Sequence, residues 1–167
     1  MKNRPRLATR LLAGGIAGFA ATLPMTLAMR ALHRRLPEEE SYPAPPRELI
    51  DRTFGALGEE NARDLTLASH FAYGAAAGAL TAALLPRPGP VAGAAAGLAV
   101  WAGSYLAWIP AVGLLEPATD HPARRNAMMI AAHLVWGAAM AMAGRELLEE
   151  RRTALAGGPD RDAPSRT

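Results

Sequence analysis

Four long apolar segments, separated by polar and charged segments, dominate the pattern of the sequence. They cover residues 11–30, 65–85, 91–115 and 127–144. An α-helix rises about 1.5 Å per residue, so each segment is long enough to cross a hydrocarbon layer about 30 Å thick. The pattern therefore predicts an all-α fold, a four-helix transmembrane bundle with both termini on the same side.

The first apolar segment has an alternative interpretation as a secretory signal peptide. No small-x-small cleavage site precedes polar sequence, however, and Arg30 directly follows the last apolar residue, Met29. Burial of four such segments in a soluble bundle is equally unfavourable in a chain of 167 residues. We therefore expect a single four-span membrane domain, residues 1–152, followed by a disordered tail, residues 153–167.

The polar segment between the first two spans contains a further helical pattern. Leu49, Ile50, Phe54 and Leu57 recur at helical spacing, with charged residues between them. Residues 47–57 are therefore predicted to form a short amphipathic helix at the membrane interface. In the second long loop, residues 116–125 carry several charged side chains. A solvated loop is favoured there over an ion or headgroup site.

Composition changes this picture in two respects. Half of the residues are apolar but only 5% are aromatic, because alanine and glycine fill the apolar segments. The chain contains no cysteine, which excludes disulfides, thiolate nucleophiles and cysteine metal sites. The net charge is +3, but the arginines flank apolar segments without interleaved aromatic residues. We therefore expect a lipid bilayer as the partner and no nucleic acid.

The sequence suggests two parallel copies of a helical hairpin. Residues 13–20 of the first span match residues 92–99 of the third, and residues 70–76 of the second match residues 133–139 of the fourth. The second match is the pattern His-x-x-aromatic-Gly. Because each copy has two spans, both copies enter the membrane from the same side, related by a pseudo-two-fold axis along the membrane normal.

Three small-residue motifs are predicted to support helix packing. Glycines spaced by four residues let two helix backbones approach closely. The residues concerned are Gly14, Gly18, Gly74, Gly78, Gly93 and Gly97.

The second and fourth spans each contain one histidine, and these form the candidate polar site. His70 lies one turn from Tyr73, and His133 lies one turn from Trp136. Ionisable residues within a bilayer often mark function, so the pair is a candidate proton relay, pH sensor or part of a ligand site. In the alternative interpretation each neutral imidazole hydrogen-bonds a neighbouring helix and holds the bundle in register.

Aromatic residues recur along the third span. Trp101, Tyr105 and Trp108 follow one stripe, which favours an aromatic belt or bundle packing over the lining of a cavity.

Motifs of enzymes are missing from the sequence. It has no G-x-S-x-G nucleophile elbow, no G-x-x-x-x-G-K phosphate loop and no H-E-x-x-H. Two histidines without a third ligand at matching depth make a poor metal site. We therefore expect no catalytic residue, no metal and no cofactor.

Several motifs, spread over most of the chain, resemble those of a group of bacterial four-span membrane proteins of unknown function. They are Leu23-Pro24-Met25-Thr26, Tyr42-Pro43-Ala44-Pro45-Pro46-Arg47, His70-Phe71-Ala72-Tyr73-Gly74, His121-Pro122-Ala123-Arg124-Arg125-Asn126 and His133-Leu134-Val135-Trp136-Gly137. The last block is also distantly similar to YagU-like inner-membrane proteins associated with acid resistance, whereas the first half departs from them. The resemblance implies a four-span protein of a bacterial inner membrane.

Two functions remain open at this point. The first is a non-enzymatic structural or envelope/acid-stress role, in which the histidines at most sense pH. The second is a small transporter or proton pathway, assembled as a homo-oligomer, in which His70 and His133 line the route. Arginines divide almost evenly between the two sides, and Arg161 and Arg166 in the tail favour cytoplasmic termini.

Overall fold

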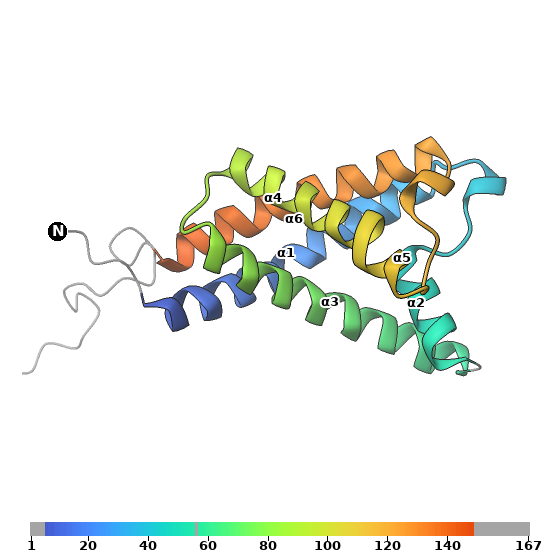
Figure 1. Cartoon of the computed structure of the whole chain (residues 1–167), viewed down its shortest axis with the longest axis horizontal. Helices are drawn as coiled ribbons and strands as arrows, with labels where there is room; N and C mark the ends of the chain where they lie inside the picture. Colours follow the sequence, from blue (N-terminus) through green and yellow to red (C-terminus); the bar gives the residue numbers. More distant parts are fainter. Residues whose placement is uncertain (1–5, 56, 149–167) are drawn as a thin grey trace, which may run out of the picture.

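The structure, a computed structural model, describes residues 6–55 and 57–148. Within these residues all regular secondary structure is helical, and there is no strand. The long helices run side by side along one axis, so that the first helix begins and the last helix ends at the same end of the molecule (Figure 1). The long loop after the first helix lies at the opposite end, which is called the loop end below. The predicted tail, residues 153–167, falls outside the described residues.

Four helical segments in the described residues are long and apolar enough to cross a membrane. They are α1 (Leu7–His33), α3 (Glu59–Leu84), the third segment (Pro90–Ala111) and α6 (Ala123–Leu148). The third segment consists of α4 (Pro90–Gly103), the π-helical η2 (Ser104–Trp108) and α5 (Ile109–Ala111). The prediction of an all-α chain with four long apolar helices is confirmed.

The observed ends differ from the predicted ones in a systematic way. Helices α1, α3 and α6 extend into the charged flanks, because polar residues at the end of a helix that emerges from lipid remain helical while their side chains reach water. The third segment was predicted to reach residue 115, but it ends at Ala111. Gly113 has a φ of +72°, which only glycine adopts readily, and the chain turns there.

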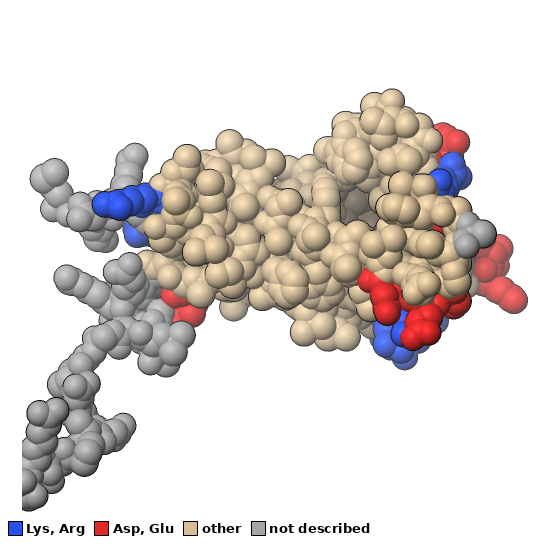
Figure 2. Space-filling model, turned by 90° about the horizontal axis from the view of Figure 1, so that it is seen from below, with Lys and Arg blue, Asp and Glu red and all other residues tan. Residues whose placement is uncertain are grey.

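The long helices form a row rather than a closed square. Helix α1 packs against α3 and α6, and α6 packs against α4 as well, whereas α3 and α4 scarcely touch. The order across the bundle is therefore α3, α1, α6, α4. Charged side chains gather at the two ends of the molecule, with an uncharged surface between them (Figure 2). This distribution is typical of a multi-pass membrane protein.

Glycines bring the backbones of α1 and α3 together. Gly14 lies against Gly78 and Ala82, and Gly18 lies against Gly74 and Gly78. A Cβ atom added to Gly18 would lie 2.8 Å from the Cα atom of Gly78, a distance that real Cβ contacts do not show. Any larger side chain at this crossing must therefore push the two helices apart.

A second crossing joins α4 to α6 through Gly93, Gly97, Gly137 and His133. A Cβ atom on Gly97 would lie 3.0 Å from the carbonyl carbon of His133 and 3.1 Å from the Cα atom of Gly137. Gly93 meets Gly137 and Ala141, as Gly14 meets Gly78 and Ala82 in the first crossing.

The two crossings correspond in a register that differs from the sequence match. Gly97 lies against His133 as Gly18 lies against Gly74, so in the structure His133 is the equivalent of Gly74. In the sequence match His133 was instead the equivalent of His70, which lies one helical turn before Gly74. Chemically similar residues thus occupy positions one turn apart in the two hairpins.

Helix α2 (Pro45–Phe54) occupies the place of the predicted amphipathic helix, residues 47–57. Proline at its first position suits a helix start, and Gly55, with a φ of +65°, ends it. Ile50 is buried against the bundle, whereas Phe54 is 54% exposed. Leu57 was predicted within the helix but lies beyond its end. The helix packs against α3, and two short 3-10 turns, η1 (Glu38–Glu40) and η3 (Ala118–Asp120), complete the loop end.

Candidate functional site

A cavity of about 300 Å³ lies between α3 and the third membrane-length segment. Its lining residues come from residues 22–25 of α1, 69–77 of α3, 100–109 of the third segment and 129–136 of α6. All of these positions lie on the loop-end side of the glycine crossings or directly beside them. The surface of the molecule is hollowed toward this end (Figure 2). The cavity therefore occupies only one half of the bundle.

The third segment leaves room for the cavity because it does not continue as a regular α-helix. Pro110 has no N–H to donate, and its ring would clash with the carbonyl of Leu106, four residues earlier. The preceding turn, Ser104–Trp108, is wound as a π-helix, which accommodates the proline by widening the helix. The wider turn places Ser104, Tyr105 and Trp108 in the wall of the cavity.

One side-chain hydrogen bond bridges α3 and η2. The Ser104 hydroxyl donates to the carbonyl of Val100 at 2.7 Å, so its oxygen is free to accept. The Tyr73 hydroxyl lies 2.6 Å from this oxygen and must then be the donor. The Tyr73 ring also lies 6.3 Å from the ring of Trp108, centroid to centroid. Tyr73 thus forms the edge of the cavity wall where α3 faces the third segment.

His133 contributes a buried ring to the cavity wall from α6. Its Nδ1 atom lies 2.8 Å from the carbonyl oxygen of Met129. A carbonyl can only accept, so Nδ1 carries the proton, and in the neutral ring Nε2 is the acceptor. His133 therefore has a defined tautomer and one acceptor left for another group.

His70 lines the same cavity from α3. Its Nε2 atom is buried and has no hydrogen-bond partner among the described residues. The structure thus brings His70 and His133 to one space, and Tyr73 and Trp136 line it as well. All four residues of the predicted intramembrane polar site are therefore gathered in one place.

The three tryptophans of the chain all line the cavity. Trp136 is only 2% exposed, and its Nε1 donates to the carbonyl of Gly18 at 3.1 Å, which ties α6 to α1. The Nε1 atom of Trp101 is buried and has no partner among the described residues. The sequence favoured belt or packing roles for Trp101, Tyr105 and Trp108. Their helical spacing indicated that the three residues share one face of the helix. Spacing does not show that this face lines a cavity.

Helix α2 supplies the wall of the cavity at the loop end. Pro45, Pro46, Leu49, Ile50 and Thr53 line it. The helix is tied to the start of α3 by Arg47, which contacts Glu59 and Asp51 at 2.8 Å each. The hydrogen bond to Glu59, and to a smaller extent the one to Asp51, raises the pKa of the Arg47 guanidinium above its usual range. The contacts lie in water at the surface and hold α2 only loosely.

Arg125, at the start of α6, organises the rest of the loop end. Its side chain is fully buried, and its guanidinium donates to the carbonyls of Tyr42 (2.8 Å) and Pro43 and to the carboxylate of Glu48 (3.2 Å). The guanidinium also lies 3.5 Å from the centre of the Tyr42 ring. The prediction of a solvated loop is wrong for this residue. Helical spacing was the available signal, because Arg125 lies four residues before Met129 and seven before Ala132 on the buried face of α6, whereas its neighbour Arg124 is exposed.

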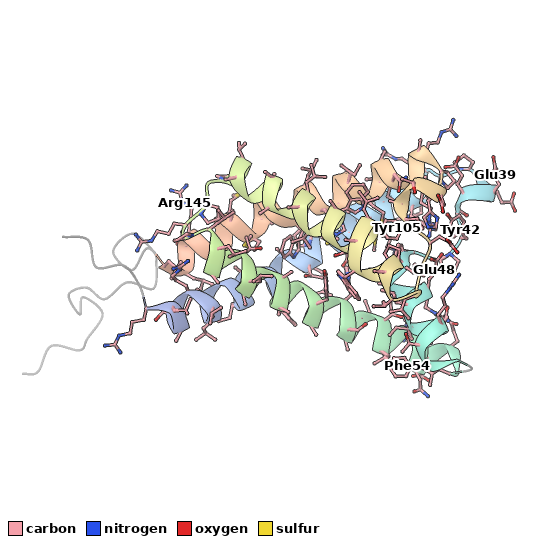
Figure 3. The ribbon with its side chains drawn as sticks, viewed as in Figure 1. Glu39, Tyr42, Glu48, Phe54, Tyr105 and Arg145 are labelled. Carbon is pink, nitrogen blue, oxygen red and sulfur yellow. The ribbon has the colours of Figure 1, made fainter. Side chains whose placement is uncertain are left out.

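Tyr42, Tyr105 and His121 complete this cluster. The Tyr42 hydroxyl and His121 Nδ1 lie 2.7 Å apart, and the rings of Tyr105 and His121 are stacked with centroids 5.3 Å apart. The labelled Tyr42, Glu48 and Tyr105 side chains come together at the end of the bundle (Figure 3). Tyr105 belongs to both the cluster and the cavity wall, because it also lines the cavity. The cluster therefore joins the cavity wall to the long loop.

Within the described residues, no three His, Cys, Asp or Glu side chains are grouped closely enough to hold a metal ion. No family model matches the chain, and neither the curated proteins nor the solved structures contain a significant match.

Proposed function

We propose that the chain is a non-enzymatic integral membrane protein that holds a lipid-soluble ligand in the cavity between α3 and the third membrane-length segment. The observation that supports this proposal is the cavity itself, whose walls are mostly apolar and include no Asp, Glu, Lys or Arg. Ligand sites are usually concave, mostly apolar and equipped with a few polar groups that orient the ligand. His70, His133, Tyr73 and Ser104 are such groups here.

Intrinsic fluorescence gives a direct test, because all three tryptophans line the cavity. We expect 1-bromohexane, a heavy-atom quencher, to quench the protein in phosphatidylcholine nanodiscs saturably rather than in proportion to its concentration in the bilayer. Ser69→Phe places a large ring in the cavity wall and should weaken the quenching several-fold. Ala72→Phe is the matched control, since Ala72 is exposed on the same helix and does not line the cavity. Quenching that does not saturate, or that is equal in both variants, would refute the proposal.

The same geometry argues against the proton pathway as the main function. A pathway needs polar groups through the whole bundle, but the cavity ends beside the glycine crossings, where the backbones are in contact. The observation in favour of a pathway is that His70 and His133 line one space.

Liposomes with an internal pH dye decide between these two functions. We expect no proton flux above that of protein-free liposomes, and the same result for the His70→Phe, His133→Phe double variant. Flux that is present in the wild-type protein and lost in a folded double variant would instead establish the pathway.

The relationship between the hairpins is also part of the proposal. We infer that the α1–α3 and α4–α6 hairpins are parallel repeats, with the register given by their glycine crossings rather than by the two histidines. In this register Gly78 corresponds to Gly137 and Gly74 to His133. Histidine and glycine thus stand at equivalent positions of the two hairpins, and the cavity has His133 on one side where Gly74 stands on the other.

The cellular setting follows from the resemblance and from the charge pattern. We place the protein in a bacterial cytoplasmic membrane with both termini in the cytoplasm, α2 at the membrane interface, and an envelope or acid-stress role as its context. The lipid bilayer is its partner, assembly into a homo-oligomer is compatible with the exposed apolar faces of its helices, and no nucleic acid, metal or other cofactor is required. Cysteine accessibility at introduced positions in the loop 85–89 and in η1 would test the orientation.

A further inference from the structure

We propose that the cavity takes an uncharged lipid alcohol, that is, a membrane-soluble amphiphile whose polar end is a hydroxyl group. This inference rests on the proposed function and specifies the chemistry of the ligand. It is supported by the absence of charged side chains among the described lining residues, and by polar atoms of Trp101, His133, His70 and Tyr105 that line the cavity without a hydrogen-bond partner among the described residues. The membrane-facing position of one cavity wall also supports it.

A charged ligand is disfavoured by the walls. None of the described lining residues is an Asp, Glu, Lys or Arg, and Arg125 and Glu48, which lie beyond Tyr105, are paired with each other, so an ion in the cavity would have no unpaired counter-charge in the wall. Taking an unpaired ion out of water into apolar surroundings is very costly. The ligand is therefore neutral at its buried end.

The Nε1–H group of Trp101 is a donor that lacks an acceptor. Its indole N–H can only donate, and it is buried without a partner among the described residues. A buried donor that is left unpaired destabilises the structure. An oxygen atom on the ligand would remove this destabilisation.

The Nε2 atom of His133 is an acceptor that lacks a donor. Its Nδ1 proton is committed to the carbonyl of Met129, so Nε2 of the neutral ring is an acceptor. A ketone or an ether has no proton to offer it, whereas a hydroxyl group does. A hydroxyl oxygen can accept from Trp101 while its proton is donated to His133.

Both side chains line the cavity, and they come from the two helices that meet at the second glycine crossing. Helices α4 and α6 are antiparallel, and Gly97 lies against His133. Trp101 is one turn beyond Gly97 on the same helix face, so it lies beside the turn of α6 from Met129 to His133. His70, whose Nε2 is also buried without a partner, lines the cavity from α3.

The wall of the cavity between α3 and η2 faces the membrane. Tyr73 and Trp108 line the cavity and are also 41% and 43% exposed, at positions within the membrane-length helices. The Tyr73 hydroxyl lies 2.6 Å from the Ser104 oxygen and the Tyr73 ring lies beside Trp108, so these side chains separate the cavity from the lipid-facing surface. A ligand from the bilayer would enter here by moving them, and its alkyl chain would extend toward the lipid while the hydroxyl end stays inside.

Three quenchers that differ only at one end test the inference. They are 1-bromohexane, 6-bromo-1-hexanol and 6-bromohexanoate at pH 7.5, added to the protein in phosphatidylcholine nanodiscs and compared by their concentration in the bilayer. We expect the alcohol to half-saturate tryptophan quenching at a concentration about tenfold lower than the alkane, in line with one or two net hydrogen bonds. The carboxylate should give no saturable quenching.

Two variants test whether the preference for the alcohol over the alkane depends on Trp101 Nε1 and His133 Nε2. Trp101→Phe removes the N–H and keeps a ring, and His133→Phe removes the acceptor. Each should bring the alcohol to the affinity of the alkane, while saturable quenching by the alkane, read from the remaining tryptophans, reports that the cavity is intact.

The possible failures are distinct. Alkane and alcohol of equal affinity in the wild-type protein, or a carboxylate that binds best, would overturn the lipid-alcohol inference and leave the cavity as an apolar ligand site. An alcohol preference that survives in both variants would also overturn it. If none of the three compounds quenched saturably, the proposed function itself would fail.

Discussion

Replacing Arg125 with leucine is expected to lower the free energy of unfolding by about 3–5 kcal/mol. The guanidinium is completely buried and holds the carbonyls of Tyr42 and Pro43 and the carboxylate of Glu48. Leucine fills part of the volume but leaves the carbonyl of Pro43 and the carboxylate of Glu48 without this donor, whereas the Tyr42 carbonyl keeps His33 Nε2 at 3.1 Å. An unpaired buried acceptor is costly. Reversible unfolding in mixed micelles with increasing sodium dodecyl sulfate, followed by tryptophan fluorescence, measures the change.

The adjacent arginine provides the control. Arg124 is exposed at the same end of α6, so Arg124→Leu should change the free energy of unfolding by no more than about 0.5 kcal/mol. Hydrogen exchange adds a local readout, because Arg125→Leu should speed the exchange of residues 40–54 more than that of α1. Equal stabilities of the two leucine variants would contradict the assigned role of Arg125.

Replacing Gly78 with leucine is the second change with a large expected effect, a loss of at least about 3 kcal/mol. A Cβ atom at Gly78 would lie 2.7 Å from the Cα atom and 3.0 Å from the nitrogen of Gly18. These are backbone atoms, which cannot rotate away as a side chain can. Helices α1 and α3 must therefore separate and lose their contacts, and the same unfolding assay detects the loss.

Gly103 is the matched position for this experiment. It is exposed, and a Cβ atom there would meet nothing within 4 Å, so Gly103→Leu should be tolerated. Gly137→Leu at the α4–α6 crossing should resemble Gly78→Leu, because a Cβ atom at Gly137 would lie 2.9 Å from the nitrogen of Gly97. A Gly78→Leu protein as stable as Gly103→Leu would show that α1 and α3 do not cross at these glycines.

The cavity and the loop-end cluster act as one unit in this structure. Tyr105 lines the cavity with its ring and stacks on His121, which lies within hydrogen-bonding distance of Tyr42. Tyr42 in turn accepts from Arg125 through its carbonyl. The Arg125→Leu variant should therefore also weaken the saturable quenching described above, although Arg125 itself does not line the cavity.

The sequence by itself determined the number and type of the long elements. A backbone in lipid must satisfy its own hydrogen bonds, so an uncharged segment of membrane length is helical almost regardless of its detailed composition. The charged residues between such segments mark their ends, and the four-residue spacing of glycines marks faces that can approach closely. For the same reason the four helices, and the placement of His70 with Tyr73 and of His133 with Trp136 on one face each of two parallel helices, were predictable from spacing. Whether these two faces meet was not.

Only the tertiary structure decided where the cavity lies and what surrounds it. The cavity exists because α3 and α4 do not pack against each other and because the helix before Pro110 widens into a π-turn. Arg124 and Arg125 are adjacent in the sequence, yet Arg124 is exposed and Arg125 is buried under the long loop. Helical spacing places Arg125 on the inner face of α6 but does not show which segment covers it. Burial of this kind depends on contacts between residues about eighty positions apart, such as Arg125 with Tyr42 and Pro43, and local periodicity carries no information about such contacts.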